Sequence, residues 1–176
     1  MIVKSKDIEE RAVEQVADLI CVAARTAPKG RGVDNLITMV VKAGTKDKIA
    51  AEMRAIAKST GSQFFERDAN CVDKTSVIVL LGQKVNVMGV MPCGYCGFAN
   101  CADNIANKGM CAISIGDLGI ALGSAVSVAS QYRVDNRIMF SVGKAALNLG
   151  LFEEGVMIAY GIPLSVSSKS PFFDRT

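Results

Sequence analysis

Residues 93–111 read C-G-Y-C-G-F-A-N-C-A-D-N-I-A-N-K-G-M-C and carry four of the six cysteines of this 176-residue chain. The cysteines follow the spacing C-x2-C-x4-C-x9-C. Thiolates are soft donors that suit iron–sulfur clusters and zinc, and four of them complete either kind of site. Gly94 and Gly97 let the backbone turn tightly, so that amide N–H groups can face cluster sulfurs. The spacing therefore predicts one metal site with four thiolate ligands: Cys93, Cys96, Cys101 and Cys111.

The pattern leaves three kinds of thiol site open. Structural zinc usually comes as two C-x-x-C or C-x-x-H knuckles, whereas this chain has one knuckle and no histidine. The spacing favours a single [4Fe–4S] cluster over a plant-type [2Fe–2S] arrangement. Zinc is the main alternative, and redox thiols without a metal are the third. We expect Cys21, which suits a buried helix position, and Cys71, which lies far from the motif, to stay outside the metal site.

Length and composition indicate one domain over residues 1–176, with the four-cysteine segment at 91–112 inside it. Half of the residues are apolar, which predicts either much buried surface or a large oligomer interface. The net charge of +3 is spread along the chain and gives no nucleic-acid footprint. No secretory signal is visible, and the apolar run 118–132 is too short and too rich in Ser and Gly to span a bilayer. We therefore expect a cytoplasmic protein with no membrane partner.

Apolar periodicity predicts helices near residues 5–25, between Thr45 and Gly61, and over 64–71, 117–132 and 143–149. Thr45 and Asp117 are the expected N-caps, and Gly61 the expected stop. Continuous apolar runs predict buried strands over 36–41, 75–81 (closed by Gly82) and 155–160 (ended by 161–163). Weaker signals predict short strands within 85–91 and 138–142. The aromatic residues of the tail, 169–175, should dock on the body or on a partner.

The turn R-T-A-P-K-G-R-G at residues 25–32 combines glycine with positive charge. Three cations beside free backbone N–H groups could hold a phosphate, although an ordinary solvated loop has the same composition. The sequence alone leaves both interpretations open.

Several motifs together resemble the uncharacterised ferredoxin-domain-containing family of bacteria and archaea. They are A-A-R-T-A-P-K-G-R-G-V-D-N-L (23–36), C-G-Y-C-G-F-A-N-C (93–101), D-L-G-I-A-L-G-S-A-V (117–126), V-D-N-R-I-M-F-S-V-G (134–143) and the tail motifs within 161–175. The resemblance covers most of the chain. That family has no assigned reaction.

A fainter resemblance is to the flavin-dependent nitroreductases, whose A-x-x-A-P-S-G turn is similar to Ala24-x-x-Ala27-Pro28-x-Gly30. It implies an α+β fold with a mostly antiparallel central sheet flanked by helices, interrupted here by the four-cysteine segment. It also implies a homodimer with FMN at the subunit interface. The tentative flavin-phosphate residues carried over are Arg25, Lys29, Gly30 and Arg31.

This chain departs from the nitroreductase pattern in three places. The N-terminal R-R-S-x-R segment that holds the flavin phosphate is missing, and Gly32 and Asp34 stand where that family has Asn and Gln. Lys29 and Arg31, with Lys169 and Arg175, are the cations that could substitute for the missing arginines.

Two function classes follow. The first is an iron–sulfur redox or electron-transfer protein that serves a redox partner, or a flavin-linked oxidoreductase. The second is a non-catalytic dimeric protein with a structural four-cysteine zinc site. The absence of histidine excludes Ser-His-Asp and Cys-His hydrolases, and no P-loop or G-x-G-x-x-G fingerprint is present.

Overall fold

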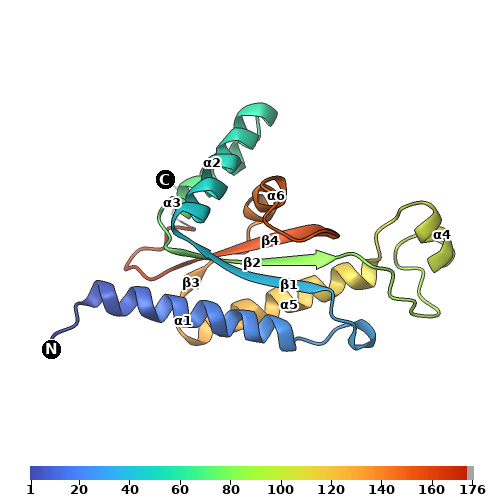
Figure 1. Cartoon of the computed structure of the whole chain (residues 1–176), viewed down its shortest axis with the longest axis horizontal. Coiled ribbons are helices and arrows are strands. Elements are labelled where there is room, and N and C mark those ends of the chain that lie inside the picture. Colours follow the sequence, from blue (N-terminus) through green and yellow to red (C-terminus); the bar gives the residue numbers. More distant parts are fainter. Residues whose placement is uncertain (174–176) are drawn as a thin grey trace.

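A computed structural model describes residues 1–173, whose strands form one four-stranded sheet with helices on both faces (Figure 1). The strand order is β1-β2-β4-β3, and every neighbouring pair is antiparallel. The predicted α+β class with an antiparallel sheet flanked by helices is therefore confirmed. The strands are β1 (Leu36–Lys42), β2 (Val77–Lys84), β3 (Asp135–Asn136) and β4 (Val156–Ser165).

The helices form two layers on opposite faces of the sheet. Figure 1 shows α1 and α5 along one face and α2, α3 and α6 on the other, while α4 lies in a lobe beyond one end of the sheet. The helical elements are α1 (Ser5–Thr26), the 3-10 turn η1 (Gly30–Gly32), α2 (Ala43–Thr60), α3 (Gln63–Asp73), α4 (Cys101–Ala106), α5 (Ala112–Gln131) and α6 (Phe140–Asn148).

The central strand β2 supplies both cores. Successive side chains of a strand point to opposite faces. Val77, Val79 and Leu81 thus enter the core shared with α1 and α5, whereas Ile78 and Leu80 enter the core shared with α2, α3 and α6. Because both faces are covered, residues 77–81 of the strand are all apolar, which explains why an uninterrupted apolar run identified it as a buried strand.

Helix α5 begins five residues earlier than the sequence predicted. Cys111 is its N-cap and Asp117 lies inside it, buried at 4% exposure, so the expected cap at Asp117 is wrong. The small and apolar residues 112–116 continue the helix without a break. With 20 residues, α5 is long and apolar enough to cross a membrane by length and composition alone. Core helices of folded domains pass the same test, and α5 contributes Leu118, Ala121 and Ala125 to the core with α1.

The start of α2 and the end of β2 also differ from the boundaries that the sequence predicted. Helix α2 starts at Ala43, ahead of the expected cap Thr45, while Gly61 ends it in the left-handed conformation as predicted (φ 73°). Strand β2 runs through Gly82 to Lys84. A side chain at Gly82 would collide with the ring of Phe152, at 2.5 Å from Cβ, so this glycine serves close packing and does not end the strand.

The last part of the sheet was predicted least well. Strand β4 continues through 161–163. Pro163 pairs with β2 alone, and β3 pairs with β4 only from Leu164 onwards. The segment 85–91 is not a strand. Within 138–142 the structure has a single bridge, Met139 to Gly161, before α6 begins. The two-residue strand β3 gave no signal in the sequence.

The tail docks on the body of the same chain, as predicted. Phe172 is buried at 3% exposure, and Arg137 donates from Nη1 to its carbonyl oxygen at 3.2 Å. The guanidinium of Arg137 also lies 5.7 Å from the centroid of the Phe173 ring. Arg175, one of the cations considered for a phosphate, lies outside the described residues.

Candidate metal centre

The four-cysteine motif lies in a lobe, residues 85–111, that projects beyond one end of the sheet (Figure 1). The lobe leaves the body where β2 ends at Lys84 and returns where α5 begins at Ala112. Its two roots are therefore a central strand and a helix that contributes to the core, so the lobe is anchored on two core elements of the fold.

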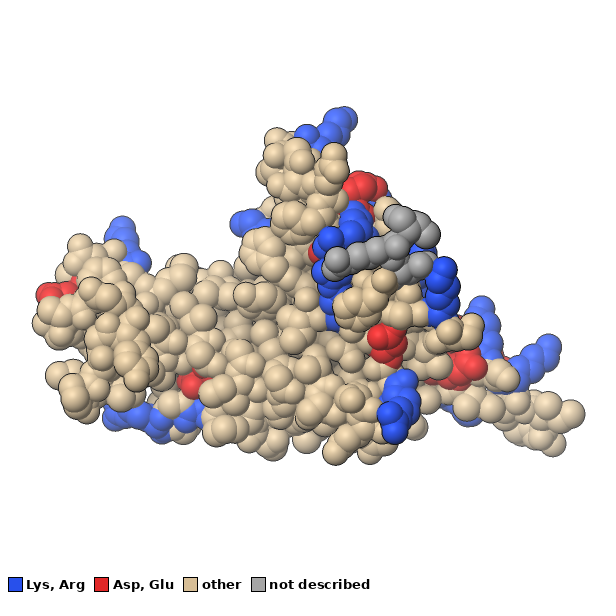
Figure 2. Space-filling model, turned by 180° about the vertical axis from the view of Figure 1, so that it is seen from behind, with Lys and Arg blue, Asp and Glu red and all other residues tan. Residues whose placement is uncertain are grey.

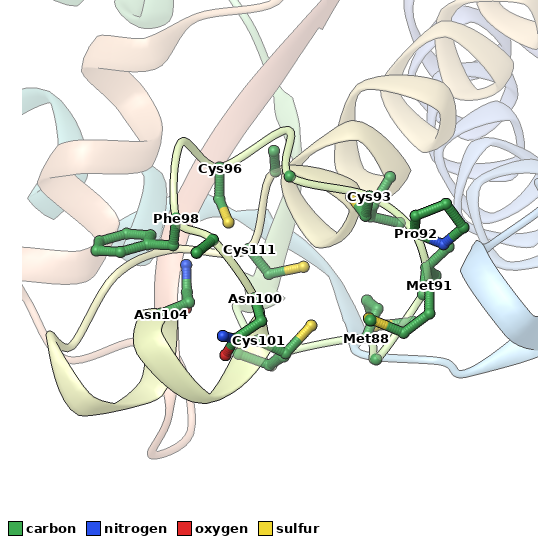
Figure 3. Close-up of a pocket in the computed structure, with 17 residues that line it drawn as sticks. Met88, Met91, Pro92, Cys93, Cys96, Phe98, Asn100, Cys101, Asn104 and Cys111 are labelled. Carbon is green, nitrogen blue, oxygen red and sulfur yellow. The ribbon is translucent and has the colours of Figure 1, made fainter.

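All four motif cysteines line one cavity of about 80 Å³ (Figure 3). One water needs only about 10–15 Å³ by the same kind of measure, so the space admits a larger group. Figure 3 shows the sulfur atoms of Cys96, Cys101 and Cys111 directed toward this shared space. Within residues 1–173, no three cysteine or acidic side chains come close enough together to hold a single metal ion. The sulfurs thus surround a volume and do not meet at a point.

The rest of the lining is uncharged. None of the 17 lining residues is Asp, Glu, Lys or Arg, and Met88, Phe98 and Ile113 give the walls their apolar character. In the lobe as a whole, the charged residues are only Asp103 and Lys108. The cysteine sulfurs are therefore the main donor atoms that the side chains of the cavity lining offer to a metal.

Local backbone geometry brings the first three cysteines together. Gly94 and Gly97 are both left-handed (φ 73° and 82°), and the N–H of Gly97 donates to the carbonyl of Gly94 at 2.9 Å. This turn, Gly94–Gly97, directly follows Cys93 and contains Cys96, and both cysteines line the cavity. Asn100 then caps α4, because its Oδ1 accepts from the N–H of Asp103 at 3.0 Å, which places Cys101 in the first turn of that helix.

Cys111 is held by a group of residues that the motif alone did not indicate. Asn104 is 1% exposed and donates from Nδ2 to the carbonyl of Met110 at 3.2 Å, while its Oδ1 has no protein partner. Gly109 has no room for a side chain, since a Cβ there would lie 2.5 Å from the Phe98 ring. Cys111 is also the N-cap of the 20-residue α5.

The other two cysteines lie elsewhere, as the sequence predicted. Cys21 is on α1 and packs against the core that the sheet shares with α1 and α5, and burial raises the pKa of its thiol. Cys71 is on α3 and donates to the carbonyl of Pro171 at 3.2 Å. Burial and, secondly, the carboxylate of Asp68 raise the pKa of Cys71. A raised pKa lowers the thiolate fraction, so neither side chain is prepared to bind a metal.

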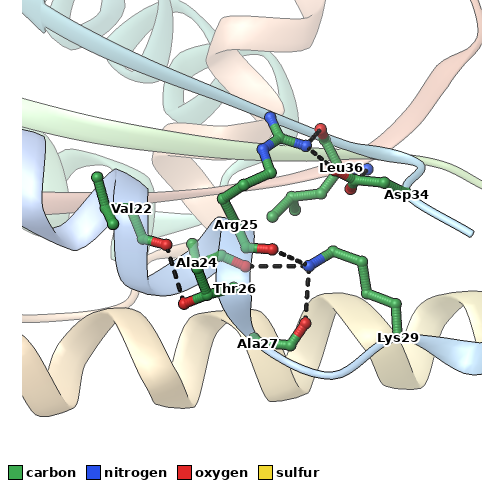
Figure 4. Close-up of polar contacts among 8 residues, drawn as sticks. All are labelled: Val22, Ala24, Arg25, Thr26, Ala27, Lys29, Asp34 and Leu36. Carbon is green, nitrogen blue, oxygen red and sulfur yellow. Dashed lines mark hydrogen bonds and ion pairs between the residues drawn. The ribbon is translucent and has the colours of Figure 1, made fainter. Parts of the chain in front are cut away.

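The candidate flavin-phosphate loop, residues 25–32, forms hydrogen bonds to other residues of its own chain (Figure 4). Arg25 donates from Nη1 to Asp34 at 2.5 Å and to the carbonyl of Leu36 at 2.7 Å. Burial is the largest single effect and disfavours the ionised Asp34, but the hydrogen bonds from Arg25 and the N–H of Leu36, with the charges of Arg25 and Lys29, together lower the pKa of that carboxyl below its ordinary value. Lys29 closes the C-terminal end of α1 by donating to the carbonyls of Ala24, Arg25 and Ala27 at 3.2, 2.7 and 2.9 Å.

The other two candidate phosphate ligands, Gly30 and Arg31, contact residues at the base of the lobe. The N–H of Gly30 donates to both carboxylate oxygens of Asp117, at 2.9 and 3.0 Å. Arg31 donates from Nη1 to the carbonyl of Met88 at 3.0 Å. The four tentative phosphate ligands therefore lie in one loop, yet each already has a partner in this conformation.

The architecture is that of the nitroreductases. A nitroreductase with bound FMN from Desulfitobacterium hafniense superposes with a TM-score of 0.62 at 18% identity, covering 88% of this chain and 78% of that one. Nitroreductase CinD from Lactococcus lactis, in complex with chloramphenicol, gives 0.63 at 13% identity, covering 89% and 79%. The likeness at these identities is one of fold.

A relative from Archaeoglobus fulgidus, described as an uncharacterised protein, is 39% identical over 99% of this chain and 98% of its own length. Residues 107–175 match the family described as "uncharacterized protein containing a ferredoxin domain". The chain belongs to this family. The match includes Cys111, whereas the other three motif cysteines precede it.

Proposed function

We propose that this protein is an iron–sulfur protein that transfers electrons, with a [4Fe–4S] cluster held by Cys93, Cys96, Cys101 and Cys111. One observation carries the proposal: all four motif cysteines line a single cavity, and none of its lining residues is Asp, Glu, Lys or Arg. Membership of a family with a ferredoxin domain supports it independently.

The arrangement of the thiols favours a cluster over zinc. Four thiolates around one zinc ion lie about 3.8 Å from one another, given a tetrahedron with Zn–S bonds of about 2.3 Å. A [4Fe–4S] cluster takes one thiolate at each of its irons, so its ligands are spread around a larger body. The single C-x2-C knuckle of this chain, with all four cysteines lining one cavity, agrees with a cluster better than with the two knuckles usual for structural zinc.

When bound, such a cluster takes up and releases electrons singly. The chain's own residues supply the ligands and the surroundings. Met88, Phe98 and Ile113 limit water around the site, and the tight turn at Gly94 and Gly97 presents backbone N–H groups near the thiols. Asp103 is the only carboxylate in the lobe, which is otherwise poor in proton-transfer groups. The site therefore suits electron transfer to a redox partner better than acid–base chemistry.

Replacing Cys101 by serine should abolish cluster binding, because it removes one of four ligands, while Cys71→Ser should leave binding intact. Both variants would be purified without oxygen, reconstituted with iron and sulfide, and analysed for iron, sulfide and zinc together with the absorbance spectrum. A Cys101→Ser protein with wild-type iron and colour would contradict the proposal. A wild-type protein that retains stoichiometric zinc and takes up no iron would favour the alternative, a structural zinc site.

We also propose a homodimer formed through the outer face of α5. Ile115 and Ile120 are exposed there at 36% and 49%, and an added Cβ at Gly116, Gly119 or Gly123 would meet nothing within 4 Å. This is a smooth apolar strip of the kind that allows close helix packing, and the neighbouring α1 extends it with exposed apolar residues. Seen from behind the view of Figure 1, the molecule shows few charged side chains across its middle, and most of those in view lie on one half (Figure 2).

Ile120→Asp should convert the dimer to a monomer, because it places a charge in the proposed contact. Phe64→Asp is the matched control, since Phe64 is 41% exposed on α3, on the opposite side of the sheet. Light scattering at micromolar concentration measures the mass directly. A wild-type protein that is monomeric under these conditions would contradict the dimer, as would an Ile120→Asp protein of unchanged mass.

FMN binding is a second candidate property, favoured by the fold shared with FMN-containing nitroreductases. If FMN binds, its phosphate should lie by the loop 25–32, and Arg31→Ala should weaken the binding several-fold through the loss of a charge-assisted contact. Fluorescence quenching of FMN titrated with wild type and variant measures this. No quenching by wild type at high micromolar concentration would leave the likeness to nitroreductases as one of fold only, with the cluster as the sole redox centre.

A further inference from the structure

We propose that the loop from Gly30 to Asn35, here called the support loop, positions the cysteine lobe, and that the charge of Arg31 tunes the reduction potential of the cluster. The inference rests on the proposed function. It assigns Arg31 a positioning and electrostatic role at the metal site, distinct from phosphate binding.

Met88 is the residue through which the support loop reaches the cavity. It lines the cavity wall and is 4% exposed. Its carbonyl accepts from Arg31 Nη1 at 3.0 Å, and its Sδ accepts from Asn35 Nδ2 at 3.6 Å. Asn35 also accepts at Oδ1 from Asn86 Nδ2 at 2.9 Å. The segment that leads to Cys93 is thus held at its side chain and at its backbone by one loop.

The same loop holds the other root of the lobe. The N–H of Gly30 donates to Asp117, which is on α5 and 4% exposed. A Cβ at Gly30 would lie 2.9 Å from Ile113 Cγ2 and 3.5 Å from Met88 Cε. Ile113 and Met88 both line the cavity, so the backbone of Gly30 packs directly behind its wall. The support loop therefore connects the approach to Cys93 with the helix that begins after Cys111.

Arg31 maintains this arrangement at a conformational cost. Its backbone is left-handed, with φ 56°, a conformation that costs a residue with a side chain of order 1 kcal/mol. Its Nη1 lies 3.1 Å from where a Cβ on Gly89 would be, so the guanidinium rests against the backbone of the lobe. The Arg31 guanidinium therefore contacts the lobe at both Met88 and Gly89.

The positive charge of Arg31 and the negative charge of Asp117 thus lie directly behind the cavity wall, whose residues are uncharged. The reduced cluster is more negative than the oxidised one, so a nearby cation stabilises the reduced form and a nearby anion destabilises it. Loss of the Arg31 charge should lower the midpoint potential, and loss of the Asp117 charge should raise it. Solvent screens the exposed Arg31 more than the buried Asp117, so the shift at Asp117 should be the larger.

The test uses Arg31→Met, Arg31→Lys and Asp117→Asn. Lysine keeps the charge without the geometry, and asparagine can still accept from the N–H of Gly30. Arg133→Met is the matched control, because Arg133 is also exposed and left-handed (φ 59°) but follows the far end of α5. Midpoint potentials come from anaerobic redox titration of the reconstituted proteins followed by electron paramagnetic resonance. Hydrogen exchange of residues 86–93 is measured in the metal-free proteins.

We expect a lower potential for Arg31→Met, a potential near wild type for Arg31→Lys, a higher potential for Asp117→Asn, and no change for Arg133→Met. Exchange over 86–93 should accelerate at least several-fold in Arg31→Met and not in the control. Unchanged potential and exchange in Arg31→Met would overturn the inference, as would shifts of equal size in Arg133→Met. If wild type takes up no cluster, the proposed function fails. The exchange measurement still decides whether the support loop positions the lobe, and the electrostatic role is then refuted.

Discussion

The carboxylate of Asp117 is the point on which the functional end of the molecule depends. A buried carboxylate is costly unless it is hydrogen-bonded. Here both oxygens accept from the N–H of Gly30, 87 residues away in the chain. This bond joins the helix that starts at Cys111 to the turn between α1 and β1. Without this hydrogen bond, the buried carboxylate of Asp117 would lose its partner at the base of the lobe, and Gly30 would no longer be held behind the cavity wall.

The same constraint explains how a nitroreductase-like fold can carry a thiol site. The two segments that bound the lobe come from β2 and α5, which are the most buried elements of the sheet and of one helical layer. Elements of this kind move little, so residues at their ends are well suited to hold metal ligands. The lobe contributes the four cysteines that line the cavity, and the support loop contacts the lobe at Met88 and Gly89. Gly30 packs closely against the cavity residues Ile113 and Met88, and the left-handed Arg31 places its guanidinium against Gly89.

Much of the fold was predictable from the sequence, because the strongest signals report burial. The uninterrupted apolar run of β2 identified a strand covered on both faces, and Gly61 identified a helix end. The failures came from tertiary contacts that no local pattern encodes. Gly82 and Pro163 look like strand ends, yet one makes room for Phe152 and the other pairs through a single neighbour. Asp117 looks like a helix cap, yet its partner is the backbone of Gly30.

The cysteine spacing predicts that Cys93, Cys96, Cys101 and Cys111 share a metal site, and these four residues line one cavity to which Cys21 and Cys71 do not contribute. It did not predict Met88, Asn104 or Arg31, since their roles depend on contacts across the fold. The most direct measurement of the central claim is X-ray absorption at the iron and zinc edges of protein purified without oxygen. Iron coordinated by sulfur, with further iron atoms as near neighbours, is the result that the four-cysteine cavity predicts. Zinc in a four-sulfur shell, or iron bound by oxygen and nitrogen, would contradict it.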